Sequence, residues 1–254
     1  AIPLIGEDLL TWIRGDYLIS GITLNRLFAF HVVVLPLALI AVIAVHILAL
    51  HEVGSNNPEG VDIKKFKDED GVPLDSVPFF PYDVLKDLVA IVFFLILFCV
   101  VIFFFPDGGG YVIEYVNYEP ANNLKTPEHI VPAWYYTPFY AMLRAITFSI
   151  GPFTAKFLGL VVFGAAIVIL ALYPWLDKSP VKSIRYKGIY SKIGLIVFVV
   201  SFFVLGYLGS VTPSPLRTLL AQVFTFTYFA YFLLMPFYTK YEKCKPVPDR
   251  IILK

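Results

Sequence analysis

Five long runs of apolar residues, separated by polar loops, dominate the pattern along the chain. A helix needs roughly 20 apolar residues to cross the hydrocarbon core of a bilayer, and each run is long enough to cross it once. No run alternates with a period of two, so the pattern favours helices over the strands of a barrel. We therefore predict an all-α transmembrane helix bundle with five spans, at residues 27–50, 84–105, 157–176, 192–209 and 216–237.

Two further segments fit amphipathic surface helices better than spans. Residues 2–14 mix leucine, isoleucine and tryptophan with acidic and basic residues, which is typical of a helix at the membrane interface. Residues 138–150 contain Arg144, whose charge disfavours insertion. The second segment belongs to the loop 106–152, which is long and rich in aromatic residues, so we expect it to be functional.

The composition supports a membrane protein and excludes a nucleic-acid-binding one. Of the 254 residues, 58% are hydrophobic and 15% are charged, whereas roughly a quarter are charged in a soluble domain. The 20 Lys and Arg residues are matched by 19 acids, which leaves no basic footprint for nucleic acid. Most of the basic residues fall on one side when the spans alternate. Because cytoplasmic loops are enriched in Lys and Arg, we predict that the N-terminus lies outside and the C-terminus in the cytoplasm.

Two histidines lie inside the first predicted span, where ionisable residues are rare and usually functional. His31 and His46 are fifteen residues apart, which on a helix corresponds to about 22 Å of rise and about 60° beyond whole turns. Both rings therefore leave one face, one near each membrane surface. Imidazole is the commonest metal ligand, so the spacing fits paired metal centres across the membrane. A hydrogen bond to a neighbouring helix and a proton relay are the alternatives.

Haem is one group that such histidines hold in a helix bundle. Each iron then needs a second axial ligand. His51 lies about 140° round the helix from His46, and His129 lies in the long loop, so neither is placed to supply it. We expect the partner ligands to come from elsewhere.

Four stretches form a specific set of motifs: LNRLFAFH at residues 24–31, HEVGSNNP at 51–58, PFFPYDVLKD at 78–87 and TPEHIVPAWYYTPFYAMLR at 126–144. Together they resemble the cytochrome b family, the quinone-reacting membrane subunits of cytochrome bc complexes (respiratory complex III). The family fold has eight spans, and the resemblance implies that this chain is the C-terminal five-span portion, incomplete without the N-terminal spans. It also implies two domains: residues 1–58, which end the haem-binding bundle, and residues 59–254, a four-span domain with the loop 106–152.

The resemblance implies that quinol is oxidised at a site on the outer side of the membrane. The residues of this outer site would be Pro132, Ala133, Trp134, Tyr135 and Tyr140, together with the surface helix at residues 2–12. The family's Pro-Glu-Trp-Tyr motif reads PAWY at residues 132–135, so the carboxylate that usually takes a proton from quinol is missing. We predict Glu128, the nearest carboxylate, as its replacement, with Tyr135 or Tyr140 acting through water as alternatives. An ordinary loop charge is the other interpretation of Glu128.

The same resemblance implies two b-type haems, with His31 and His46 each supplying one axial ligand and the absent N-terminal spans supplying the others. Quinone would be reduced at an inner site, with protons taken up inside and released outside. The residues of the inner site would be His51, Ser55, Asn56, Lys86 and Asp87. Imidazole and carboxylate groups suit it because they hydrogen-bond quinone carbonyls and carry protons. An ordinary solvated helix start is the alternative for Lys86 and Asp87.

The spacing of the two histidines departs from many family members, which have fourteen residues where this chain has fifteen. The extra residue lies between His31 and Pro36. We predict a local bend or bulge near the proline that absorbs it.

The remaining expectations are implied by the family. The partners would be a Rieske iron-sulfur protein, a c-type cytochrome, the N-terminal part of cytochrome b, membrane lipid and a second copy of the complex. The quinone would be ubiquinone or menaquinone. The tail KPVPDR at residues 245–250 resembles bacterial members, which implies the bacterial cytoplasmic membrane.

Two other function classes compete with a quinol-cytochrome c oxidoreductase subunit. One is a proton-coupled transporter that uses His31 and His46 as relay groups, but no further charge lies at the middle of a span. The other is a purely structural bundle, but Gly151, Gly159 and Gly164 are too few and too loosely spaced to indicate helix interfaces built on small residues. We therefore favour the haem-bearing oxidoreductase.

Overall fold

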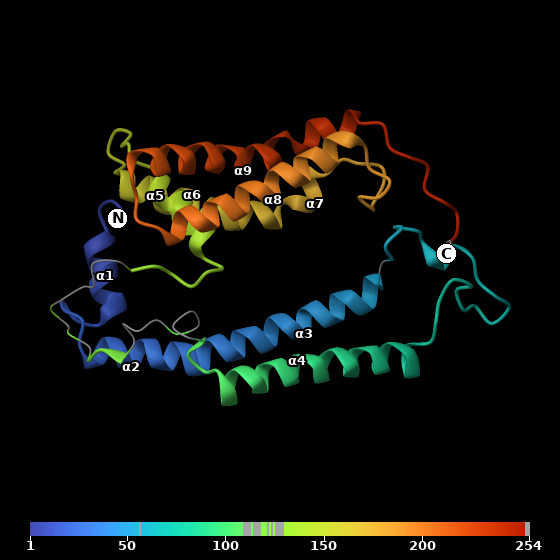
Figure 1. The fold of residues 1–254 in the computed structure, drawn as a ribbon, viewed down its shortest axis with the longest axis horizontal. Coiled ribbons are helices and arrows are strands. Elements are labelled where there is room, and N and C mark those ends of the chain that lie inside the picture. The colour runs from blue at the N-terminus through green and yellow to red at the C-terminus, as the bar shows by residue number, and fades with distance from the viewer. Residues whose placement is uncertain are drawn as a thin grey trace. The chain divides into compact units, whose positions relative to one another are not determined.

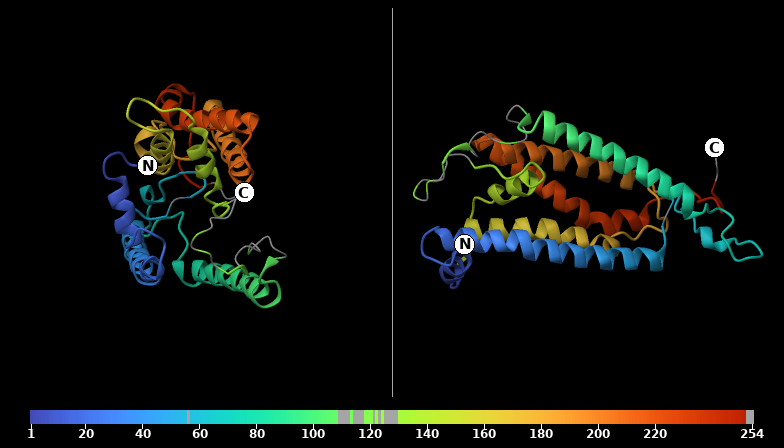
Figure 2. Two further views of the ribbon diagram at one scale, coloured as in Figure 1. Left: turned by 90° about the vertical axis from the view of Figure 1, so that its left-hand side faces the viewer. Right: turned by 90° about the horizontal axis from the view of Figure 1, so that it is seen from below.

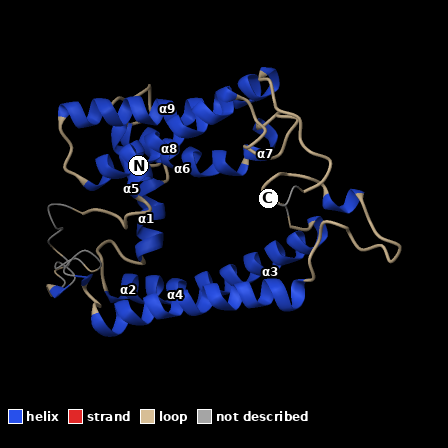
Figure 3. Cartoon of the chain, turned by 45° about the vertical axis from the view of Figure 1, so that its right-hand side comes forward, coloured by secondary structure: helices blue, strands red, loops and turns tan. Residues whose placement is uncertain are grey.

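The chain is built from helices joined by loops. The computed structural model describes residues 1–55, 57–108, 113, 118–120, 122, 124 and 130–251. Within these ranges there is no β-strand, which confirms the all-α prediction (Figure 3). In chain order the helices are α1 (Gly6–Arg14), α2 (Gly21–Ala29), η1 (Phe30–Val34), α3 (Leu35–Val53), η2 (Ile63–Lys65), η3 (Phe79–Asp83), α4 (Val84–Phe104), α5 (Thr137–Ala145), α6 (Ala155–Ala171), α7 (Tyr173–Leu176), α8 (Ile189–Ser210) and α9 (Pro215–Tyr241) (Figure 1).

Four described helical segments are long and apolar enough to cross a membrane, and they make the chain an integral membrane protein. They cover Gly21–Val53, Phe79–Phe104, Ile189–Ser210 and Pro215–Tyr241, which correspond to four of the predicted spans. The remaining predicted span, 157–176, is divided into the shorter apolar helix α6 and a last turn, α7. Pro174 lies at the start of α7, where its missing N–H costs no hydrogen bond, but it cannot extend the hydrogen-bond ladder of α6.

Contacts divide the chain into two compact units, which are described separately. Unit 1 contains Ala1–Val61 and Pro127–Pro248, and unit 2 contains Asp62–Thr126 and Asp249–Lys254. Helix α4 belongs to unit 2, and the other long helices belong to unit 1. The expected domain boundary at residue 58 stays a prediction.

The core of unit 1 lies among α5, α6, α8 and α9, and α8 and α9 run side by side in all views (Figure 2). Its largest fully buried side chains are Tyr228, Phe232 and Met142. The Tyr228 hydroxyl donates a hydrogen bond of 2.8 Å to the carbonyl of Ala166, so the polar atom is satisfied in apolar surroundings. Phe198 of α8 stacks on Tyr231 of α9 with ring centroids 4.7 Å apart. This aromatic packing holds the last two spans together.

Helix α5 approaches its neighbours closely at two glycines. A Cβ atom on Gly159 of α6 would lie 2.5 Å from the Leu143 carbonyl oxygen. A Cβ atom on Gly209 of α8 would overlap the Thr137 carbonyl oxygen. Small residues permit such contacts between helix backbones in membranes, so both positions fix how near α5 lies to the spans. The short helix predicted in the long loop is thus present, although it ends at Ala145 rather than at residue 150.

Helices α1 and α2 form a hairpin at the N-terminal end, and α1 covers most of the predicted surface segment 2–14. Gly15 ends α1 with φ of 80°, and a Cβ atom there would lie 2.6 Å from Ile22 Cγ2, so both conformation and space require glycine. The Thr23 hydroxyl of α2 donates a hydrogen bond of 2.8 Å to the Arg14 carbonyl. A side-chain hydrogen bond therefore links the two helices of the hairpin.

Candidate functional site

The two span histidines lie on one long helix that contains a π-turn. Helices α2, η1 and α3 run without interruption, and η1 is the π-helical turn that contains His31. The N–H of Leu35 donates to the carbonyl of Phe30, five residues earlier, directly before Pro36. A π-turn accommodates one residue more than an α-helical turn, and such turns are frequent at functional sites. The structure thus confirms the predicted bulge near the proline.

The bulge sets the angle between the two imidazoles. With one of the fifteen residues absorbed, His31 and His46 are phased as about fourteen α-helical residues, which is about 40° short of whole turns with about 21 Å of rise. Both side chains are exposed in unit 1. They therefore present nitrogen atoms from one side of the helix, ten residues from its start at Gly21 and seven residues from its end at Val53, where each can bind a ligand.

A hollow lies beside the helix one turn before His31. It has a volume of about 510 Å³ and is lined by Trp12, Ile13, Arg26, Leu27 and Phe30. Its wall is mostly apolar, and Arg26 is the charged residue of the lining; its guanidinium donates to the carbonyl of Trp12. This combination suits a flat apolar ligand with a polar edge. Sequence reasoning missed Arg26, although a cation at the edge of an apolar run is a usable signal.

The predicted outer-site residues Pro132, Ala133, Trp134 and Tyr135 form a turn that leads into α5. The Tyr136 N–H donates to the Ala133 carbonyl at 2.8 Å. Trp134 is 83% exposed, and its ring meets that of Tyr135 edge-on at 5.5 Å between centroids. The aromatic rings therefore project from the turn rather than into the core of unit 1.

Tyr140 lies one turn into α5, with the Arg144 guanidinium 4.6 Å from its ring centroid. Tyr140 is half-buried, unlike the exposed aromatic residues before it. Glu128, the predicted proton acceptor, lies outside the described residues. The structure places α1 and α5 in the same unit, and a joint pocket between them stays a prediction.

The predicted inner-site residues fall in both units. His51 is exposed in the last turn of α3, and Ser55 follows it in unit 1. Asn56 lies outside the described residues. Lys86 and Asp87 lie at the start of α4 in unit 2, where Asp87 also suits the positive end of the helix dipole. The grouping of these residues into one inner site stays a prediction.

A polar contact that sequence reasoning missed holds the segment after α3. The Glu59 carboxylate accepts hydrogen bonds of 2.8 Å from the Arg185 guanidinium and from the Tyr186 hydroxyl. Burial and the adjacent Glu59 carboxylate raise the pKa of Tyr186. The Ser183 hydroxyl donates to the Pro58 carbonyl at 2.6 Å. The loop that follows His51 is therefore attached to the loop between α7 and α8.

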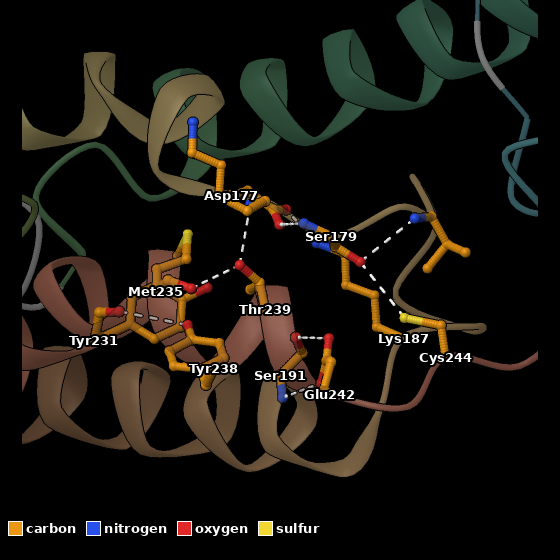
Figure 4. Close-up of polar contacts among 12 residues, drawn as sticks. Asp177, Ser179, Lys187, Ser191, Tyr231, Met235, Tyr238, Thr239, Glu242 and Cys244 are labelled. Atoms are coloured by element: carbon orange, nitrogen blue, oxygen red, sulfur yellow. Dashed lines mark hydrogen bonds and ion pairs between the residues drawn. The ribbon is translucent and has the colours of Figure 1, made fainter.

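A second missed cluster surrounds the start of α8 (Figure 4). The buried Glu242 carboxylate accepts hydrogen bonds from the Ser191 N–H at 3.0 Å and from the Ser191 hydroxyl at 2.5 Å. Lys187 forms an ion pair with Asp177, and both side chains are largely shielded from solvent. These contacts join residues ten to fifty-one positions apart, which explains why no local pattern indicated them.

Two family models match the chain. The model described as cytochrome b (N-terminal)/b6/petB matches residues 1–111, and the model described as cytochrome b (C-terminal)/b6/petD matches residues 120–229. The expectation that the chain is the C-terminal portion alone is therefore wrong, because residues 1–111 match the N-terminal model. The matches to both halves also do not support calling the chain an incomplete C-terminal piece.

Known relatives and a solved structure are similar to the chain over nearly its whole length. Cytochrome b of Allochromatium vinosum is 52% identical over 99% of this chain and 61% of its own length. Cytochrome b of Rickettsia typhi is 40% identical, over 99% of this chain and 58% of its own length. The chain thus spans about three fifths of the length of these relatives. A chain of a structure titled hyperthermophilic respiratory complex III has a TM-score of 0.80 and 34% identity, covering 95% of this chain and 58% of that chain. Sequence and fold agree that the chain belongs to the cytochrome b family.

Proposed function

We propose that the chain acts as the membrane subunit of a quinol-cytochrome c reductase. The observation that carries this proposal is the long helix Gly21–Val53, which presents His31 and His46 from one side, one in each half of the helix. Membership of the cytochrome b family supports it. The function couples quinol oxidation on one side of the membrane to quinone reduction on the other, with proton release outside and uptake inside.

The residues of the helix fit two b-type haems. Neutral imidazole is a common axial ligand of haem iron, and His31 and His46 would each supply one. Both histidines are exposed, and Arg26, five residues before His31 on the same helix, is a cation that suits an acidic edge. Haem bound there would supply one-electron transfer across the membrane. The protein's own contribution is to fix the two imidazoles about 21 Å apart along the helix.

The outer site would bind quinol against the turn at Pro132–Tyr135. Trp134 and Tyr135 offer exposed apolar ring faces, and their N–H and O–H groups can orient a quinol hydroxyl. Ala133 is exposed in this turn and carries no group that accepts a proton. Proton transfer from quinol would therefore pass to Glu128, or through water by way of Tyr135 or Tyr140.

The inner site would use His51 from the last turn of α3 and Ser55 and Asn56 from the residues after it, with Lys86 and Asp87 from the start of α4. An imidazole N–H and a protonated carboxyl O–H there would donate to the quinone carbonyls and deliver protons. The Glu59 contacts with Arg185 and Tyr186 support this assignment because they restrain the backbone just after His51 and Ser55.

The expected partners are a Rieske iron-sulfur protein and a c-type cytochrome, in a homodimeric complex with ubiquinone or menaquinone as substrate. The excess of Lys and Arg on one side of the predicted spans supports a cytoplasmic tail, and the resemblance of the tail at residues 245–250 to bacterial members supports a bacterial cytoplasmic membrane.

The decisive experiment is a reduced-minus-oxidised absorbance spectrum of native membranes carrying His31→Leu, His46→Leu or His51→Leu. Each of the first two variants is expected to lose one b-type haem and to abolish quinol-dependent cytochrome c reduction. His51→Leu is the matched control and is expected to keep both haem bands, because it lies outside the pair. Wild-type spectra in His31→Leu and His46→Leu would exclude axial ligation and favour a proton relay.

A further inference from the structure

Arg144 joins the outer-loop helix α5 to the end of the span α8. Its Nη2 donates to the carbonyls of Leu208 at 2.5 Å and Val211 at 3.1 Å, with a longer contact of 3.4 Å to the Gly209 carbonyl. The last carbonyls of a helix have no partner within the helix, and a cation suits the negative end of its dipole. Arg144 therefore caps α8 from a neighbouring helix.

Three other contacts hold α5 in the same place. Gly209 of α8 and Gly159 of α6 let the carbonyls of Thr137 and Leu143 approach without a side chain between them. Gln222 Nε2 of α9 donates to the Ala145 carbonyl at 3.0 Å, at the end of α5. One helix is thus fixed against three others, with Arg144 as its charged anchor.

The aromatic turn of the outer site is a direct extension of α5. The Thr137 hydroxyl donates to the Trp134 carbonyl at 2.7 Å, and the Tyr140 N–H donates to the Tyr136 carbonyl at 3.0 Å. Thr137 itself is buried, while Trp134 is exposed. A shift of α5 therefore moves the exposed rings, because nothing flexible separates them from the helix.

We propose that Arg144 is a positioning residue for the outer quinol site, acting through α5 on the turn at Pro132–Tyr135. The inference rests on the proposed function, because it assumes that this turn binds quinol. The carbonyl contacts come from Nη2 alone, and the planar guanidinium also lies over the Tyr140 ring, a contact that a lysine ammonium reproduces only in part. Replacement by lysine is thus expected to give a partial effect.

Glu242 provides a matched control at the other end of α8. The buried Glu242 carboxylate accepts a hydrogen bond from the Ser191 N–H and so caps the N-terminus of that helix. A negative charge at a helix N-terminus is stabilising. Glu242 has no contact with α5 among the described hydrogen bonds. Loss of either cap lowers the stability of α8, but only loss of Arg144 lets α5 and the attached turn at Pro132–Tyr135 move.

The test compares the purified complex carrying Arg144→Gln, Arg144→Lys, Glu242→Gln or Trp134→Ala. Arg144→Gln is expected to raise the KM for quinol by about tenfold, because small displacements from a site are costly. Hydrogen–deuterium exchange of residues 131–145 should become faster in the same variant. Arg144→Lys should fall between it and the wild type. Glu242→Gln should lower the thermal midpoint without changing the KM or the exchange of residues 131–145.

The results separate this inference from the proposed function. If Trp134→Ala weakens quinol oxidation while the Arg144 variants leave KM and exchange unchanged, the positioning role is wrong and the outer site stands. If Trp134→Ala leaves quinol kinetics unchanged, the proposed outer site is wrong. The positioning role of Arg144 for quinol is then wrong as well. Equal KM changes in Glu242→Gln and Arg144→Gln would show that Arg144 acts only as a cap of α8, so the positioning role would be wrong. If Arg144→Gln does not assemble, Arg144→Lys decides by the same readouts.

Discussion

The histidine-bearing helix and the α8–α9 pair are both apolar and of membrane-spanning length, yet they differ in burial. No residue in the apolar window of the described helix Gly21–Val53 is buried, compared with 22% of the window in α8 and 28% in α9. Apolar side chains need no protein partner in a bilayer, because lipid tails are as apolar as leucine. An imidazole within a membrane span does need a partner, because ionisable side chains are costly in lipid. Under the proposed function, the ligand residues therefore lie on the exposed helix, and the bundle supplies the rigid support for the aromatic turn.

The largest expected effect comes from changing the register of the exposed helix. An alanine inserted between Val33 and Val34 should turn His46 by about 100° relative to His31 and remove one haem, with loss of quinol oxidation. Deletion of Val33 should instead remove the residue that the π-turn absorbs, so both haem bands should remain. Absorbance difference spectra of membranes measure both results.

The control for this pair is Val33→Ala, which changes the side chain without changing the length of the helix. It should give a wild-type spectrum. Identical spectra for the insertion and the deletion would show that the π-turn does not set the angle between the two histidines.

The exposed helix was largely predictable from sequence, because its features are local. The apolar run, the two histidines and the extra residue before Pro36 all lie within one stretch, and the bulge is predicted by comparing the histidine spacing with that of the cytochrome b family. The supporting bundle was less predictable. From the sequence, Arg144 indicates only a barrier to insertion, and Gly159 is too isolated to indicate an interface. Their partners lie far away in the chain, in Leu208 and Leu143, and only the fold brings those carbonyls near.

A smaller effect is expected from matched leucines in the two regions. Leu205 of α8 is fully buried, and Leu48 of α3 is 70% exposed. Leu205→Ala should lower the free energy of unfolding by about 2 to 5 kcal/mol, because it leaves a cavity in a packed core. Leu48→Ala removes the same atoms from a surface that needs no protein partner. Thermal midpoints of the purified complex should therefore fall for Leu205→Ala and stay close to the wild type for Leu48→Ala.

Comparable losses for the two leucines would contradict the distinction between the regions. They would show that the exposed face of α3 is packed against protein in the assembled complex, so that its side chains contribute as core residues do. A loss confined to Leu205→Ala would support lipid contact at Leu48.

The smallest effect is expected where charged groups meet at the surface of unit 2. Arg250 binds the Asp75 carboxylate with Nη2–Oδ1 at 2.8 Å and Nε–Oδ2 at 3.2 Å, which joins the tail to the loop before α4. The hydrogen bond from Arg250 is the main cause that holds the pKa of Asp75 below its ordinary value. Because the folded pKa is lowered, the contact contributes fully at pH values above about 4 and is lost as the pH falls through the folded pKa.

Arg250→Gln should therefore speed hydrogen–deuterium exchange of residues 246–251 a few-fold relative to wild type between pH 5 and 8. The difference should vanish when Asp75 becomes protonated in the acid range. Lys243→Gln, which changes another exposed basic residue near the tail, is the control and should not alter exchange there. A difference that disappears already near pH 6 would contradict a lowered pKa for Asp75. The thermal midpoint should hardly change in either variant, because exposed ion pairs contribute little, in contrast to the buried Glu242 that caps α8.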